Sequence, residues 1–227
     1  MIYITGATDG NECEWITSVE PMLHPGDTII IAGSFGHGKW RGPLSEDVFY
    51  DRIEAALYTV LFVDGLHDDT DRLSVLPVEE WRGGKVHRVR SGILHLMRGE
   101  IFDIGGSCVF VLGGGPTGRA LTEAEYRNAE ENLRKLRRLG RPLDAVITQT
   151  APPDALCALS AYGDPFVTQG DRPLLGFLER VDGQFLYQRW YFGRYPVDAE
   201  LWGNRIALHD AVRELRTGLI VGWKSAQ

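Results

Sequence analysis

The chain has 227 residues, of which 44% are apolar and 24% are charged, and its formal net charge at pH 7 is -7. This composition is typical of one globular domain, which we expect to span residues 1–227, and the acidic balance makes nucleic acid an unfavourable partner. No apolar run reaches the roughly 18 residues that a membrane-spanning helix requires, so we expect no membrane association.

The first quarter of the chain alternates strand and helix patterns. Residues 2–4 predict a short apolar strand, and residues 28–32 and 59–63 predict two continuous apolar strands. Residues 45–57 predict a helix between the latter two. The expected buried face of this helix consists of Phe49, Ile53, Ala56 and Leu57. Strands that are apolar throughout suit a sheet covered on both faces, so the rhythm indicates an α/β fold.

The middle of the chain predicts short strands separated by glycine-rich turns. We expect a meander of antiparallel pairs at 85–90, 93–97, 100–104 and 108–112. Thr122 and Glu125 form a capping-box pattern, which predicts that a helix begins there. A strand follows at 144–148, and a last one at 185–192.

Five predicted strands end in loops of one kind. These loops lie around Ala7, Ser34, Leu66, Gln149 and Arg194. In open α/β sheets, ligands bind where loops leave the carboxyl ends of the strands. We therefore expect the five loops to line one pocket.

Longer stretches of the chain resemble the calcineurin-like metallophosphoesterases, in particular a group of small bacterial members. Residues 61–69 (LFVDGLHDD) are similar to that group's L-F-V-D-G-N-H-E, and residues 77–87 (PVEEWRGGKVH) and 95–102 (HLMRGEIF) resemble the group over most of their length. The resemblance implies a four-layered α/β sandwich of two mixed β-sheets flanked by helices. It also implies two divalent metal ions, such as Mn, Fe or Zn, and a metal-activated water that attacks phosphorus.

The first two metal-binding loops of the family are altered in this chain. The family's first loop reads G-D-x-H-G, and here Ala7 replaces its aspartate and Asp9 its histidine. The second loop supplies a bridging aspartate, which is Ser34 here. Alanine has no ligand atom, and the Ser34 hydroxyl is a weak neutral donor.

The remaining loops are altered as well. The family's third loop reads G-N-H-D or G-N-H-E, and its asparagine is Leu66 here, whereas its catalytic histidine is retained as His67. The fourth loop's histidine is Gln149, and the two histidines of the last loop are Arg194 and Pro196. The guanidinium of Arg194 would repel a divalent ion beside it.

These replacements predict a metal-free, catalytically inactive homologue, a pseudoenzyme that acts by binding. We expect Asp9, Ser34, Gln149 and Arg194 to hold an anionic or phosphate-bearing ligand, because a guanidinium with neutral donors suits an oxyanion. A protein partner is the other expected ligand. We also expect Arg194 to pair with Asp9 in the space that the metal ions occupy in the family, and no cofactor to be needed.

Two other hypotheses stay open. The chain is an active phosphoesterase if Asp9, His37 and His67 hold a single repositioned ion, or if His67 performs metal-independent acid–base chemistry. It is a structural subunit if the former metal pocket has repacked around Leu66 and Pro196.

Other polar groups are expected to be structural or solvent-exposed. We expect His24, His87, His95 and His209 to be unpaired with one another and the acidic cluster of Asp64, Asp68, Asp69 and Asp71 to cap helices and face solvent. The basic run at 134–141 predicts a solvated helix face. Three widely spaced cysteines, Cys13, Cys108 and Cys157, predict buried free thiols, and with no expected signal peptide they favour the cytoplasm.

Overall fold

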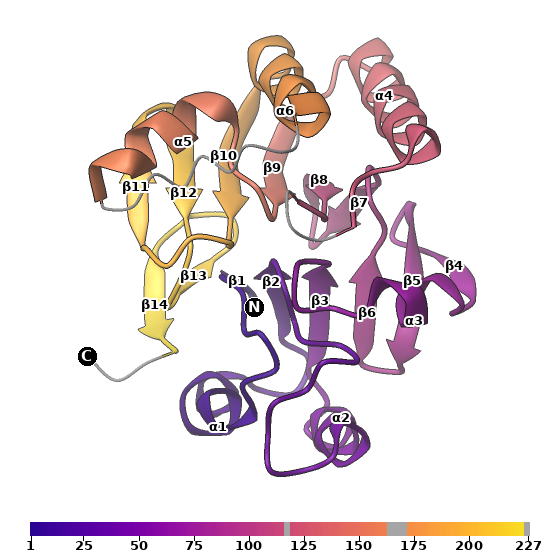
Figure 1. The fold of residues 1–227 in the computed structure, drawn as a ribbon, viewed down its shortest axis with the longest axis vertical. Coiled ribbons are helices and arrows are strands. Elements are labelled where there is room, and N and C mark those ends of the chain that lie inside the picture. The colour runs from indigo at the N-terminus through magenta and orange to yellow at the C-terminus, as the bar shows by residue number, and fades with distance from the viewer. Residues whose placement is uncertain (116–118, 163–171, 225–227) are drawn as a thin grey trace.

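In a computed structural model, the chain forms a sandwich of two mixed β-sheets with helices on both outer faces (Figure 1). The structure describes residues 1–115, 119–162 and 172–224. Helices α4, α5 and α6 cover one outer face, and α1 and α2 lie on the opposite side of the two sheets (Figure 1). The expected α/β sandwich with flanking helices is therefore confirmed.

The first sheet has eight strands in the order β14-β13-β1-β2-β3-β6-β5-β4. Its four central strands, β1, β2, β3 and β6, are parallel, and the strands on either side of them are antiparallel. The bounds are β1 Ile2–Thr5, β2 Thr28–Ala32, β3 Thr59–Val63, β4 Val78–Trp81, β5 Gly84–Arg90, β6 Ile93–Leu96, β13 Ala211–Glu214 and β14 Ile220–Trp223.

The second sheet has six strands in the order β11-β12-β10-β9-β8-β7. Strands β8, β9, β10 and β12 are parallel, and β7 and β11 close the two edges in antiparallel fashion. The bounds are β7 Ile101–Ile104, β8 Ser107–Leu112, β9 Leu143–Thr148, β10 Tyr187–Phe192, β11 Ala199–Leu201 and β12 Arg205–Ala207.

Six α-helices and four short helical turns complete the described part of the chain. The helices are α1 Glu12–Glu14, α2 Glu46–Ala55, α3 Thr70–Ser74, α4 Glu123–Arg138, α5 Pro153–Leu159 and α6 Arg172–Gln184. The short turns are η1 Trp15–Val19, η2 Glu20–Met22, η3 Ser160–Tyr162 and η4 Trp202–Asn204. Thr122 caps α4 with both bonds of the predicted capping box.

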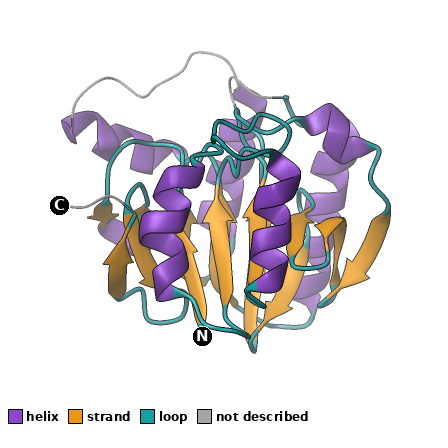
Figure 2. Cartoon of the chain, turned by 90° about the horizontal axis from the view of Figure 1, so that it is seen from below, coloured by secondary structure: helices purple, strands orange, loops and turns teal. Residues whose placement is uncertain are grey.

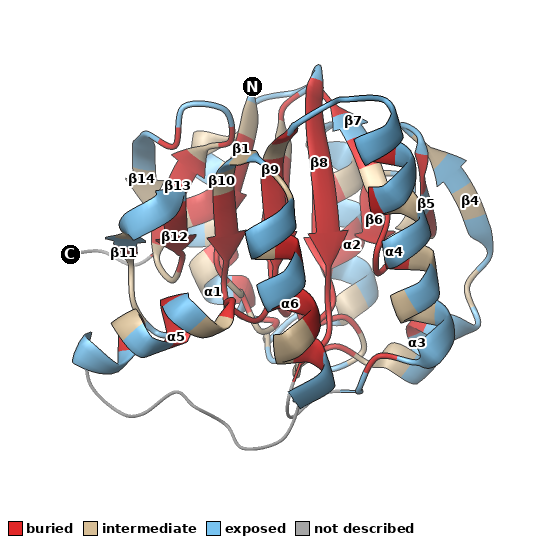
Figure 3. Cartoon of the chain, turned by 90° about the horizontal axis from the view of Figure 1, so that it is seen from above, coloured by how far each residue is buried: buried red, intermediate tan, exposed pale blue. Residues whose placement is uncertain are grey.

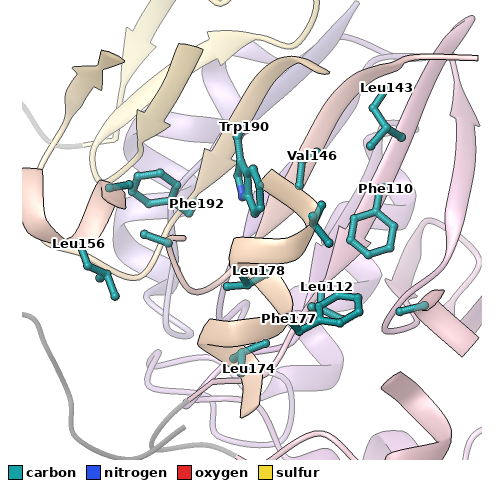
Figure 4. Close-up of a cluster of buried hydrophobic side chains, with 14 of the residues drawn as sticks. Phe110, Leu112, Leu143, Val146, Leu156, Leu174, Phe177, Leu178, Trp190 and Phe192 are labelled. Carbon is teal, nitrogen blue, oxygen red and sulfur yellow. The ribbon is translucent and has the colours of Figure 1, made fainter. Parts of the chain in front are cut away.

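Alternate residues of each central strand enter different cores. In β2, Ile30 faces the core between the sheets, whereas Ile29 and Ile31 face the core under α1 and α2. The same alternation in the second sheet sends Phe110 of β8 and Trp190 of β10 into the core under the helices α4 to α6, which Figure 4 shows together with Leu178 and Phe177 of α6. The strands are buried on both faces, as Figure 3 shows, which explains why they are apolar throughout.

Most predicted elements of the chain form, with three differences. The predicted meander at 85–112 is split, because β5 and β6 belong to the first sheet whereas β7 and β8 belong to the second. The strand at 185–192 is not the last, because β11 to β14 follow it. Leu57 is 68% exposed rather than part of the buried helix face, because α2 ends at Ala55 and Leu57 turns the chain at φ 60°.

The cysteine prediction is correct only in part. Cys108 is buried, but Cys13 and Cys157 are exposed, and all three thiols are free. Within the described ranges, no helix has the length and apolar character needed to cross a membrane.

Candidate functional site

The loops that follow β1, β2 and β10 meet at one edge of the sandwich. The Ala7 N–H donates to the Gly193 carbonyl at 3.1 Å, and the N–H groups of Thr8 and Asp9 donate to the Ser34 carbonyl at 2.9 and 3.0 Å. Figure 2 shows central strands that run side by side toward loops at this end of the molecule. Three of the five loops that were expected to line one pocket therefore contact one another here.

Close backbone approach at this edge depends on glycine. A Cβ atom added to Gly193 would overlap the Ala32 carbonyl, and one added to Gly6 would overlap the Leu208 carbonyl. The two sheets can come this close only because these positions lack side chains. The space between the first and last loops is thus largely filled by backbone.

Ser34 and His67 are bonded within the loops themselves. The Ser34 side chain is buried, and its Oγ accepts a hydrogen bond of 2.9 Å from the His67 N–H. The His67 Nδ1 lies 3.2 Å from Nη2 of Arg41. Because a guanidinium only donates, Nδ1 is the acceptor if this contact is a hydrogen bond. His67, which the resemblance matches to the family's catalytic histidine, therefore contacts an exposed arginine.

Gln149 joins the loops after β3, β8 and β9. Its amide is assigned the orientation that satisfies both of its polar atoms. The amide nitrogen donates to the carbonyls of Asp64 and Gly114 at 3.2 and 3.1 Å, and the amide oxygen accepts from the Leu66 N–H at 3.2 Å. The neutral side chain of Gln149 thus joins these loops by hydrogen bonds.

Asp68 joins the loops that follow β2 and β3. Its buried carboxylate accepts from the N–H groups of Gly36, His37 and Gly65 at 2.8, 2.9 and 2.8 Å. Burial raises the pKa of Asp68 to about 8, although the hydrogen bonds from the three N–H groups act in the opposite direction. Asp68 is therefore a structural group, and its expected solvent exposure is wrong.

The predicted ion pair between Arg194 and Asp9 does not form. A different cation, Lys224, lies at the first loop: it is 1% exposed, and its ammonium donates to the Ala7 carbonyl. Burial lowers the pKa of Lys224, and the carboxylates of Glu14, Asp9 and their neighbours partly offset this. No motif marked Lys224 in the sequence, because the pairing of β14 with β13 and of β13 with β1 brings it to the first loop.

Arg194 instead keeps a buried nitrogen without a partner. Its Nη1 is inaccessible to solvent and makes no hydrogen bond, and its Cζ lies 6.0 Å from the ring centre of Tyr195. The Thr150 Oγ1, in the neighbouring loop after β9, is also buried and unpaired. Pro196 is exposed beyond this point. Two hydrogen-bonding atoms are thus left unsatisfied at the ends of β9 and β10.

Asp9, His37 and His67 are not brought together as metal ligands. His37 is buried rather than in a surface loop, and its Nδ1 lies 2.9 Å from the Tyr50 hydroxyl. Burial lowers the pKa of His37 to about 4. Among residues 1–115, 119–162 and 172–224, no three or more His, Cys, Asp or Glu side chains are grouped closely enough to hold a metal ion.

The positions that the resemblance matches to metal ligands do not fit two metal ions. Ala7, Leu66 and Pro196 carry no ligand atom, and Arg194 brings a positive charge. The neutral oxygens of Ser34 and Gln149 are occupied by loop N–H groups. No step of a two-metal mechanism can be assigned to these residues.

A buried polar network that sequence reasoning missed adjoins these loops. Asp64 is paired with Arg98 at 2.5 Å and with His95 at 3.2 Å, and His95 Nδ1 lies 3.0 Å from His87 Nδ1. Burial alone would raise the pKa of Asp64, but Arg98 and His95 hold it well below its usual value. Two expectations are therefore wrong. Asp64 is buried rather than a solvent-exposed helix cap, and His87 and His95 contact each other.

The register of the hairpin formed by β5 and β6 could have predicted the contact between His87 and His95. Residues 87 and 95 lie directly opposite each other on β5 and β6, which follows from any hairpin centred on Ser91. The network lines a small cavity of about 50 Å³ together with Met97 and Glu125. Among four cavities formed by the described residues, none is lined by Ala7, Ser34, Leu66, Gln149, Arg194 or Pro196.

Comparison of the chain with models of protein families, with curated proteins and with solved structures finds no match in any of the three.

Proposed function

We propose that this chain is a metallophosphoesterase-like protein that has lost hydrolysis and binds an anion, such as a phosphate group, at the carboxyl ends of β9 and β10. The observation that carries the proposal is the buried Nη1 of Arg194, which has no hydrogen-bond partner. A buried charged donor without a partner is costly, and an oxyanion would satisfy it. The substitutions at the former ligand positions support the loss of the metal ions.

The position of Thr150 adds a neutral donor to the proposed site. In the parallel pair β9 and β10, Thr148 lies opposite Phe192, so the loops that carry Thr150 and Arg194 leave the sheet side by side. The Tyr195 hydroxyl accepts from the Ala151 N–H at 3.2 Å and keeps the two loops together. A guanidinium beside a hydroxyl is a donor set that suits a tetrahedral oxyanion.

Calorimetric titration of the protein with inorganic phosphate and with adenosine monophosphate tests the proposal. We expect Arg194→Ala to weaken binding about tenfold or more, because charge-assisted hydrogen bonds contribute about 1.5–3 kcal/mol. Arg52→Ala is the matched control, since Arg52 lies on α2, across the two sheets, where it pairs with Glu20 at 2.7 Å. Equal affinity in the wild type and Arg194→Ala would refute anion binding at Arg194.

The same protein sample tests the loss of the metal site. After incubation with manganese, zinc and iron, elemental mass spectrometry is expected to find far less than one ion per chain. A stoichiometric, tightly held ion would restore the hypothesis of an active phosphoesterase, and Asp9, His37 and His67 would be the first residues to replace.

A further inference from the structure

Strand β14 forms one edge of the first sheet, where Figure 1 shows it on the outer side of β13. Within the described ranges β14 pairs with β13 alone, so the backbone N–H and C=O groups along its other side face no strand. A Cβ atom added to Gly222 would overlap Sδ of Met22, which shows that one face of β14 packs closely on turn η2. The open edge is therefore held in a defined position.

Exposed apolar side chains follow one another along this edge. Leu219, Ile220 and Val221 are 67%, 43% and 44% exposed. Residues 217–223 carry no charge, and the next residue, Lys224, is buried. The edge thus presents both open backbone groups and apolar side chains to water, and covering the side chains would be favourable.

The other three edge strands of the two sheets carry acidic residues. Strand β4 contains Glu79 and Glu80, β7 contains Asp103, and β11 contains Glu200. A second strand of the same sequence placed against one of these edges would bring carboxylates together, which disfavours self-pairing. Among the edge strands in the described ranges, β14 is the one that lacks such a charge.

We propose that β14 pairs with β14 of a second copy of this chain, antiparallel and about a two-fold axis, so that the first sheets of the two copies become continuous. This pairing brings the exposed apolar residues of one copy against the same residues of the other and opposes no like charges. A strand that carried charges would leave them without partners on this uncharged edge. The assembly ends at two copies, because the pairing uses the same edge of each.

The short length of β14 predicts that this dimer is weak. The strand has four residues, and its pairing with β13 is irregular between Val212 and Arg213, so few backbone hydrogen bonds can form across the axis. Such a contact is smaller than the interfaces of permanent dimers. Association is therefore expected to be reversible and to depend on protein concentration.

Sedimentation velocity of the full chain over a wide range of concentrations tests the proposal. We expect a reversible equilibrium between monomer and dimer for the wild type. Val221→Glu and Val221→Lys are each expected to raise the dissociation constant about tenfold or more, because each sets like charges against one another near the axis. An equimolar mixture of the two variants is expected to associate more tightly than either alone, because opposite charges then meet.

The matched controls are Val78→Glu and Val78→Lys. Val78 is an exposed valine on β4, the edge strand at the opposite side of the same sheet. These variants make the same changes in charge and are expected to dimerise like the wild type. Recovery of association in the mixture of Val221 variants would exclude misfolding as the reason for their weaker association.

Several results would overturn the proposal. A wild type that stays monomeric at every concentration would do so, and would leave a strand of another protein as the candidate occupant of this edge. Equal dissociation constants for the wild type and the Val221 variants would place any dimer interface elsewhere. Assemblies larger than a dimer, or a mixture that associates no more tightly than its components, would contradict two-fold pairing of β14.

Discussion

Asp64 is a buried residue whose charge is balanced by neighbouring side chains. Its carboxylate is fully buried and holds Arg98, whose guanidinium is itself almost fully buried. Removing one partner of such a pair leaves an uncompensated buried charge, whereas removing both is much less harmful. The contribution of Asp64 to stability therefore depends on whether Arg98 remains.

We predict that Asp64→Asn lowers the free energy of unfolding by about 3–5 kcal/mol. Urea denaturation followed by circular dichroism measures this change. Asp71→Asn, at an exposed position in α3, is the control and is expected to stay within about 0.5 kcal/mol of the wild type. Asp64→Asn/Arg98→Met is expected to be more stable than Asp64→Asn alone, and the opposite order would contradict the interpretation.

A second prediction concerns pH and His87. Burial and, to a smaller extent, the neighbouring His95 lower the pKa of His87 from its usual 6.5 to about 4, while Asp64 acts in the opposite direction. Between pH 4 and pH 6.5, His87 is protonated in the unfolded chain but not in the folded chain. The contribution of neutral His87 to the free energy of unfolding is therefore fully present above pH 6.5 and is lost as the pH falls toward 4.

We therefore expect the stability advantage of the wild type over His87→Gln to shrink as the pH is lowered through this window. Denaturant titrations of both proteins at several pH values measure the difference. Asp68 also titrates in this range, because its raised pKa makes its contribution to the free energy of unfolding decrease as the pH rises from 3.8 to about 8. Both proteins contain Asp68, so its effect cancels in the difference between them. A difference that is constant with pH would show that His87 titrates normally in the folded protein.

At the scale of residues, the sequence located the loops but not the contacts within them. Strand ends and glycines were sufficient to predict that Ala7, Ser34 and the Arg194 loop share one edge. The sequence could not show that Lys224 binds the Ala7 carbonyl in the first loop, because that contact depends on how β13 and β14 add to the sheet. Burial of His37 likewise depends on a tertiary contact, with Tyr50 of α2.

At the scale of elements, helix α2 ends in a conformation that its sequence does not favour. Leu57 follows this helix at φ 60°, a left-handed conformation that costs a residue with a Cβ about 1 kcal/mol relative to glycine. Its side chain is 68% exposed and contributes little burial. We predict that Leu57→Gly raises the free energy of unfolding by up to about 1 kcal/mol.

The control for this prediction is the equivalent leucine after α4. Leu139 is similarly exposed, but its φ of -80° and ψ of -5° are right-handed. Leu139→Gly is therefore expected to destabilise the protein by about 0.5–1 kcal/mol, the usual cost of glycine's extra freedom in the unfolded chain. Thermal or chemical denaturation of the two variants should give changes of opposite sign, and changes of the same sign would argue against the role of φ.

Helices and strands could be predicted from the sequence where their own residues, rather than tertiary contacts, determine the secondary structure. Strands β2 and β3 were identified to the residue, because five consecutive apolar or β-branched residues fit only a strand covered on both faces. Strand β4, with the sequence VEEW, was missed because it lies at an exposed edge and pairs only with β5. Helix α6 was missed because Gly176 and Gly183 weaken its helical pattern.

At the scale of the whole molecule, the division into two sheets follows from tertiary structure alone. Strands β6 and β7 are separated by only a short turn, yet they belong to different sheets, because the Gly99 N–H in that turn bonds to the Val111 carbonyl of β8. Nothing in the local sequence distinguishes this connection from an ordinary hairpin. The antiparallel pairs of the meander were therefore predictable, and their partition between sheets was not.

The first strand of the protein is completed by some of its last residues. Thr5 of β1 donates through its hydroxyl to Ala211, 206 residues later, and Lys224 binds the loop that follows β1. A chain emerging from the ribosome therefore carries β1 without this neighbour until residues 211–214 have been synthesised. Until β13 pairs with β1, the first sheet has an open strand edge there, which is the kind of surface that promotes association with other chains.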